Sequence, residues 1–186
     1  DENFKKCVRD YLKAYSIRSF NLLDAGEFFS EYIASSPLLE KFPFLSDLAA
    51  LEYAHLKAFH FFEVSRIEES ELLKLFSVDP FFVRVELHPS VFLIKSKWNL
   101  KEIYNHPKNR VDKGIYFFIV YEKLKEVFIK KVEEEMYNLL LSFKNNATLG
   151  DSLFILGDQP KKIQEAFKMI ATEGWMSQVT VDRESQ

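Results

Sequence analysis

The sequence predicts an α+β fold, with a helical domain over residues 1–78 followed by strands and a helix-turn-helix-like domain over residues 79–186. Two changes of period predict it. Apolar residues recur at helical spacing up to about residue 78, whereas apolar and polar residues alternate beyond it. Helical spacing returns near residue 133, so that strands and a hairpin precede three helices. That order is typical of a winged-helix-like module.

Helical spacing runs through residues 1–78 in several segments. Residues 4–15 place apolar side chains on one face of a helix, and residues 28–33 indicate a second one. Residues 44–64 predict a long helix, and residues 69–76 a short one before the boundary at Val78-Asp79-Pro80. We expect the long helix to turn these side chains toward a core: Leu45, Leu48, Leu51, Ala54 or His55, Phe59 and Phe62.

Alternation marks the strands. Phe81, Val83, Val85 and Leu87 point one way, and the strand ends at His88-Pro89, where we expect a turn. Residues 91–98 predict a second strand. Residues 115–121, IYFFIVY, are apolar on both faces and predict a central strand, with Tyr116, Phe118 and Val120 buried on one face and Phe117 and Ile119 on the other. A turn at residues 123–125 leads to a hairpin strand over residues 127–132.

Three helices are expected over residues 133–145, 149–156 and 160–173. Thr148 is a candidate N-cap, Pro160 suits a first helical turn, and Gly174 suits a C-terminal stop. Residues 133–175 carry seven acidic residues against four lysines, although a helix that reads DNA normally lies in a basic field. We therefore expect a scaffold that holds a protein or peptide. A DNA-binding protein or winged-helix transcriptional regulator is the alternative.

Basic charge concentrates in the predicted strands. Residues 79–132 carry 11 Lys and Arg against 6 Asp and Glu, whereas both helical regions are net acidic. An acidic, extended ligand would be drawn to the sheet. A solvated basic strand face is the other interpretation of the same charges.

The sequence offers little catalytic material. Glu52 and His55 have the spacing of a di-iron bundle motif, but such a site needs two such pairs, so we expect a buried hydrogen-bonded pair and no metal. Cys7 lies on an apolar helix face and is expected to be inert core. With five glycines there is no Gly-rich phosphate loop. We predict a chain that is not an enzyme and has no cofactor.

The location follows from the single cysteine and the absence of long apolar runs. One cysteine fits a reducing compartment, and no run approaches the roughly 18 apolar residues of a membrane span. We expect a cytoplasmic protein without membrane contact. The chain begins with Asp1 and not with Met, so it is open whether the N-terminus is truncated.

Several runs together carry a resemblance to a known bacterial family. They are FPFLSDLAALEY at 42–53, Ala58-Phe59-His60, LHPSV at 87–91 and Glu173-Gly174-Trp175. The chain resembles the HvfC family, whose N-terminal region is commonly labelled a DNA-binding domain. The resemblance covers most of the chain, and family members usually have additional N-terminal helices that this chain is expected to lack.

The resemblance implies a non-catalytic partner protein in ribosomal peptide modification. Such a protein forms a heterodimer with a multinuclear non-heme iron oxidative enzyme and binds the leader of the precursor peptide. Strand addition to the hairpin beside the last helix is a mechanism for leader binding, and we expect it to use Val127, Ile129, Lys130, Lys131, Lys162 and Lys168. Solvated lysines are the alternative. For enzyme docking the candidates are Phe59, Phe61 and Phe62, of which at least two are expected in the core.

Overall fold

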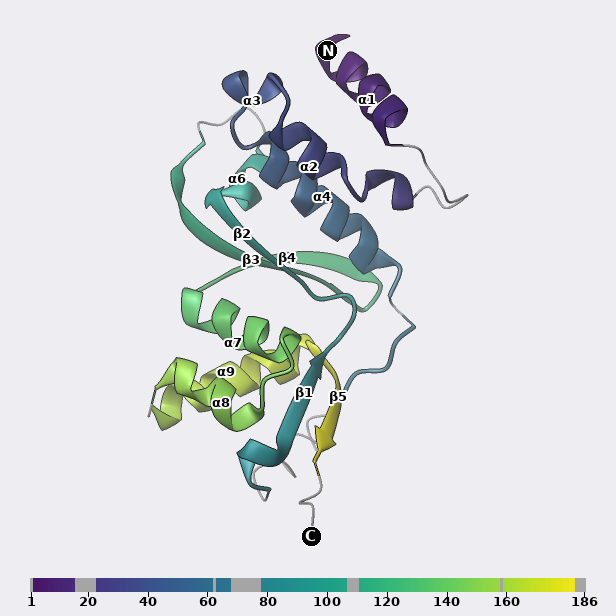
Figure 1. Cartoon of the computed structure of the whole chain (residues 1–186). Coiled ribbons are helices and arrows are strands. Elements are labelled where there is room, and N and C mark those ends of the chain that lie inside the picture. Colours follow the sequence, from purple (N-terminus) through teal and green to yellow (C-terminus); the bar gives the residue numbers. More distant parts are fainter. Residues whose placement is uncertain are drawn as a thin grey trace. The chain divides into compact units, whose positions relative to one another are not determined.

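The structure, a computed structural model, describes residues 2–15, 23–61, 63–67, 78–106, 111–157 and 159–182. The fold is α+β, as predicted (Figure 1). Packing groups residues 1–57 with 94–116 in one compact unit and residues 58–93 with 117–186 in another. The helical domain expected over residues 1–78 stays a prediction. The expected helix at 69–76 lies outside the described residues.

The first unit contains most of the helices that precede the sheet. They are α1 (Glu2–Ala14), the short η1 (Asp24–Gly26), α2 (Phe29–Ala34), α3 (Leu38–Lys41) and α4 (Leu45–Phe59). Tyr11 of α1 packs against Phe29 and Tyr32 at ring-centroid distances of 5.1 and 5.5 Å, and its hydroxyl donates to the carbonyl of Ala25 at 2.6 Å. Cys7 is buried on the same helix, as expected.

The buried face of α4 agrees with the predicted one at Leu51 and Ala54 and differs from it at the end of the helix. Leu51, Ala54 and Ala58 are buried, at the spacing of one helical face. Phe59 is 50% exposed, because it lies one residue and therefore about 100° around the helix from Ala58. The expectation that Phe59 faces the core was wrong. Ala54 and Ala58 occupy two of the three buried positions on the face that also carries Leu51.

The sheet has the strand order β2 (Phe92–Trp98), β3 (Lys113–Lys123), β4 (Glu126–Val132), so β3 is central, as predicted. Residues 117–121 of β3 are buried, but Tyr116 is only half-buried, and its predicted burial was wrong. Between β2 and β3 lies a short helix, α6 (Leu100–Asn105), which the sequence analysis did not predict.

The β3–β4 hairpin turns on two residues with positive φ, Leu124 (56°) and Lys125 (67°), as in a type I′ turn. Residues other than glycine are destabilised by a positive φ. A hydrogen bond to the preceding strand offsets part of this cost. The amide of Lys125 donates to Oε1 of Glu122 at 2.6 Å. The predicted turn is confirmed.

Three helices follow the hairpin as predicted: α7 (Glu134–Lys144), α8 (Leu149–Leu153) with the short η3 (Phe154–Leu156), and α9 (Pro160–Glu173). The hydroxyl of Thr148 accepts the Asp151 amide at 3.1 Å, which confirms the N-cap. Pro160 begins α9, and Gly174 ends it with a φ of 66°. Figure 1 shows α7, α8 and α9 packed together beside the hairpin.

A second sheet, of two strands, lies in the same unit as α7, α8 and α9. β1 (Val83–Leu87), preceded by the short η2 (Pro80–Phe82), pairs antiparallel with β5 (Met176–Val181), so that Val83 lies opposite Val181. The sequence analysis did not predict β5. One core joins Val83 and Val85 of β1 to Ile119 of β3, Phe167 of α9 and Trp175 before β5.

Candidate functional site

The outer edge of β4 is the first element of the candidate site. β4 pairs with β3 from Val127 opposite Glu122 to Val132 opposite Phe117, and within the described part of the chain no strand pairs with its other edge. An edge strand presents backbone N–H and C=O groups that can pair with another chain. Strand addition is therefore geometrically possible along β4.

A groove lies at the end of this strand. It has a volume of about 360 Å³ and is bounded by the last residues of β4, the start of α7, η3 and the first turns of α9. Its floor is apolar and its rim is charged. The apolar residues are Val132, Met136, Leu156, Ala166 and Met169, and the charged ones are Lys130, Lys131, Glu133, Glu135, Lys162 and Glu165.

The groove brings together three of the six residues predicted to bind a peptide, namely Lys130, Lys131 and Lys162. Val127 and Ile129 lie earlier on β4, half-buried, and Lys168 is exposed on α9, so these three line the edge or the helix surface and not the groove. The sequence analysis did not predict the apolar floor of the groove. On α9 its signal was present, because Lys162, Glu165, Ala166 and Met169 recur at the spacing of one helix face.

Lys130 ties β4 to the end of α9. Its ammonium lies 2.5 Å from Oε1 of Glu173, whose other oxygen accepts the Tyr121 hydroxyl at 2.7 Å and lies 3.6 Å from the ammonium of Lys123. Burial alone would raise the pKa of Glu173, but the hydrogen bonds from Lys130 and Tyr121 outweigh it and lower that pKa. Burial and the bond to Glu173 raise the pKa of Tyr121. Lys130 therefore has a structural role.

Lys162 is placed differently. It lies 3.0 Å from Oε1 of Glu135, and both side chains are about half exposed, at 45% and 51%. An exposed pair of this kind contributes little, typically about 0–1 kcal/mol. An acidic ligand at the rim can therefore take Lys162 from Glu135 at small cost.

The aromatic residues predicted to dock a partner are only partly described. Phe59 is 50% exposed, Phe61 is half-buried, and Phe62 lies outside the described residues. The ring of Phe59 makes an edge contact with His60 at a centroid distance of 5.8 Å. About half of the Phe59 side chain is thus apolar surface open to solvent.

The Glu52–His55 pair does not form the expected buried contact. Glu52 is exposed, and the half-buried ring of His55 lies against Tyr104 at a centroid distance of 5.8 Å. No hydrogen bond between the two side chains is found in the structure as described, so the expectation of a hydrogen-bonded pair was wrong. Across the described ranges, no three His, Cys, Asp or Glu side chains gather as a metal site. None of the helices described is long and apolar enough to cross a membrane.

The LHPSV run forms a buried hydrogen-bonded cluster around His88. His88 is fully buried after β1, and its Nε2 lies 3.1 Å from the carbonyl of Val64, so this nitrogen carries the proton and donates. Nδ1 then accepts from the hydroxyl of Ser90 at 2.7 Å. Burial lowers the pKa of His88, which favours this neutral form. The turn predicted at His88-Pro89 is present, and it also holds the segment at residues 63–67.

Arg66, close in sequence to Val64, bonds to two further segments of the same unit. Its guanidinium lies 2.7 Å from Oε2 of the buried Glu122 and donates to the carbonyl of Gly174 at 3.1 Å. The fully buried Trp175 meets Tyr121 edge-on at 5.4 Å. Residues of the LHPSV and Glu173-Gly174-Trp175 runs are therefore explained by packing around β3.

No known protein-family profile matches this chain, and no curated protein sequence matches it.

Proposed function

We propose that this chain is a non-catalytic partner protein that binds the leader of a precursor peptide and an iron-dependent oxidative enzyme in ribosomal peptide modification. The partner class comes from the HvfC-like runs in the sequence. The observation that supports leader binding is the open edge of β4 ending beside an apolar groove.

The leader would extend β4 by one strand. Backbone hydrogen bonds along the edge supply affinity, and a side chain entering the groove supplies selectivity. The rim carries three lysines and three glutamates, so its charge alone selects no acidic peptide. The apolar floor therefore selects an apolar anchor, and an acidic leader residue displaces Glu135 from Lys162.

The oxidative enzyme would supply the chemistry and the metal. Of the three aromatic residues predicted to dock it, Phe59 is the one described as exposed and would offer an apolar contact. The chain then acts in the cytoplasm as an accessory subunit without a cofactor of its own. A gene for an iron-dependent oxidative enzyme and a short Cys-rich peptide beside this chain's gene is the expected neighbourhood.

N-methylated leader peptides test strand addition without changing the protein. The leader of the neighbouring precursor is titrated by calorimetry, unmodified and with N-methyl groups on alternate residues in either of two registers. In an added strand only every second amide faces β4, so one register should abolish binding and the other should leave it intact. Equal effects of both registers would contradict strand addition.

Two matched pairs of variants locate the site. Met169→Ala should weaken binding about tenfold by removing part of the groove floor, while Lys168→Ala should not. Lys162→Glu should weaken it by up to about 1 kcal/mol, because the rim is solvent-screened, and more than its neighbour Lys161→Glu. Pulldown of the neighbouring enzyme tests the second partner, and failure to bind enzyme and leader alike would leave the proposal without support.

A further inference from the structure

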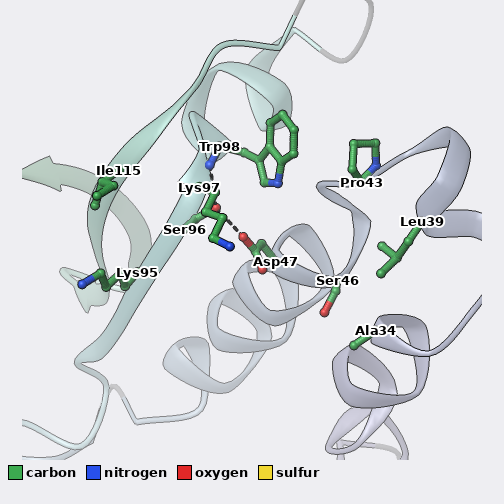
Figure 2. A pocket seen from close by; sticks show the side chains of 10 residues that line it. All are labelled: Ala34, Leu39, Pro43, Ser46, Asp47, Lys95, Ser96, Lys97, Trp98 and Ile115. Atoms are coloured by element: carbon green, nitrogen blue, oxygen red, sulfur yellow. Dashed lines mark hydrogen bonds between the residues drawn. The ribbon is translucent and has the colours of Figure 1, made fainter.

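A second cavity lies within the other unit, between β2 and the helices α2, α3 and α4. It has a volume of about 510 Å³, within the range of small-ligand sites, and Figure 2 shows the residues that line it. Residues 95–98 of β2 form one wall, and the helices form the other. All lining residues belong to residues 1–57 and 94–116, so the cavity lies within one compact unit.

The wall formed by β2 and α4 is fixed by hydrogen bonds. The buried hydroxyl of Ser96 donates to Oδ2 of Asp47 at 2.6 Å and accepts the amide of Trp98 at 3.0 Å. The indole of Trp98 also packs edge-on against Phe44, at a centroid distance of 6.4 Å. Two groups of the lining, the carboxylate of Asp47 and the indole of Trp98, are therefore held in place before a ligand arrives.

Three polar groups of the lining are open to a ligand. Oδ1 of Asp47 accepts no hydrogen bond from the residues that the structure describes, and the exposed Lys97 has no ion-pair partner among them. The indole nitrogen of Trp98 lies on the side that faces the space toward Pro43 (Figure 2). Lys95 points away from these groups and has an interaction of its own, so it is not counted with them. The site thus offers one acceptor and two donors.

The charges of these groups cancel. Asp47 carries one negative charge and Lys97 one positive charge, so together they select neither an anion nor a cation. A ligand that is only anionic is repelled by Asp47, and a ligand that is only cationic is repelled by Lys97. A zwitterion avoids both penalties. Its ammonium donates to Oδ1 of Asp47, and its carboxylate accepts from Lys97 and from the indole N–H of Trp98.

The apolar part of the lining selects the rest of the ligand. Leu39 and Pro43 lie across the cavity from the indole of Trp98, and Ala34 extends this apolar surface. The volume leaves room beyond the two charged groups for a large side chain. A side chain between the indole and the apolar surface removes apolar area from water, and an aromatic ring also packs well against the indole.

We infer that this cavity binds a free α-amino acid with a large apolar side chain. A single carbon separates the ammonium and the carboxylate of such a ligand, so one small molecule can pair with Asp47 and Lys97 together. The site is separate from the proposed leader groove, and it does not depend on the proposed function.

The indole N–H signals in ¹H–¹⁵N NMR spectra report on binding directly. The chain has two tryptophans, and Trp98→Phe identifies the signal of Trp98. Titration with L-phenylalanine should shift that signal with a Kd on the order of 1 mM or tighter. N-acetyl-L-phenylalanine lacks the ammonium and L-phenylalaninamide lacks the carboxylate, so each should bind about tenfold more weakly.

Charge-removing variants assign each charged group of the ligand to its partner. Asp47→Asn keeps an acceptor for the Ser96 hydroxyl, and it should weaken L-phenylalanine about tenfold without weakening the N-acetyl derivative. Lys97→Gln should weaken L-phenylalanine by about the same factor without weakening the amide. Asp24→Asn on η1 and Lys101→Gln on α6 remove the same charges outside the lining and should leave the affinity unchanged.

Four results would overturn the proposal. They are an unmoved Trp98 signal, binding of either derivative as tight as that of the amino acid, an unchanged affinity in Lys97→Gln, and equal effects of the lining and control variants. Lys97 is exposed, so Lys97→Gln should fold like the wild type and tests the site even if Asp47→Asn does not fold.

Discussion

The two outer strands of the three-stranded sheet, β2 and β4, differ in the side-chain bonds that hold them. In β2 the amide of Trp98 bonds to Ser96, and Ser96 bonds in turn to Asp47 of α4. In β4 no further strand pairs with the outer edge, so far as the described residues extend, and the nearest tie is the side-chain bond from Lys130 to Glu173. A side chain thus satisfies one backbone amide of β2, whereas the tie from β4 to α9 joins two side chains and leaves the backbone groups of β4 available.

The comparison shows where each edge can hold a ligand. Where a strand amide is already bonded internally, as at Trp98, a ligand can use only side chains. An open edge can use its backbone, as proposed for the leader. The open edge also needs support from inside the sheet, and Arg66, Glu122 and Glu173 provide that support.

Breaking the internal support of the β3–β4 hairpin should have the largest effect. Arg66→Met leaves the carboxylate of Glu122, which is 2% exposed, without its cation. Removing one partner of a buried pair costs about 3–5 kcal/mol. Urea unfolding should show that loss, and Arg9→Met, whose pair with Glu2 is exposed, should change stability by less than about 0.5 kcal/mol. A small loss in Arg66→Met would mean that the hairpin does not depend on this pair.

Breaking the bond between Ser96 and Asp47 should reduce the free energy of unfolding by less. Asp47→Ala leaves the buried hydroxyl of Ser96 without its acceptor and should cost about 1–3 kcal/mol. Ser96→Ala in the Asp47→Ala background should cost less than Ser96→Ala alone, because the two side chains share one bond. A double-mutant cycle in urea measures that coupling. Additive losses would show that the bond between Asp47 and Ser96 does not contribute to stability.

The tie between β4 and α9 should depend on pH. The pKa of Glu173 is lowered in the folded state, so its stabilisation is complete above the ordinary value of 4.5 and is lost as the pH falls through the folded-state value. Unfolding at a series of pH values should show a steeper fall below about pH 4.5 for the wild type than for Glu173→Gln. Equal slopes of stability against pH in the two proteins would exclude Glu173 as the source of the pH dependence.

The chain is not expected to bind duplex DNA specifically at either strand or through its helices. The helix-turn-helix segment over residues 133–175 has seven acidic residues and four lysines. At about 150 mM salt, fluorescence anisotropy should show only weak binding without sequence preference. Submicromolar, sequence-selective binding would favour a regulator of winged-helix type.

The sequence predicted elements that a local pattern encodes. The seven apolar residues at 115–121 identified the central strand, and Thr148 and Gly174 identified helix ends, because these depend on near neighbours. β5 was missed because its partner, β1, lies far away in the sequence. The Lys130–Glu173 tie spans 43 residues and the groove floor combines three helical elements with β4, so neither has a local pattern.

Amide hydrogen exchange along β4 tests the central claim most directly. The account predicts that the leader peptide slows exchange of alternate amides over residues 127–132 by about tenfold or more, and leaves the amides of residues 94–98 in β2 unchanged. Protection in β2 in place of β4, or leader binding without protection of either strand, would contradict the assignment of β4 as the open edge that takes the peptide.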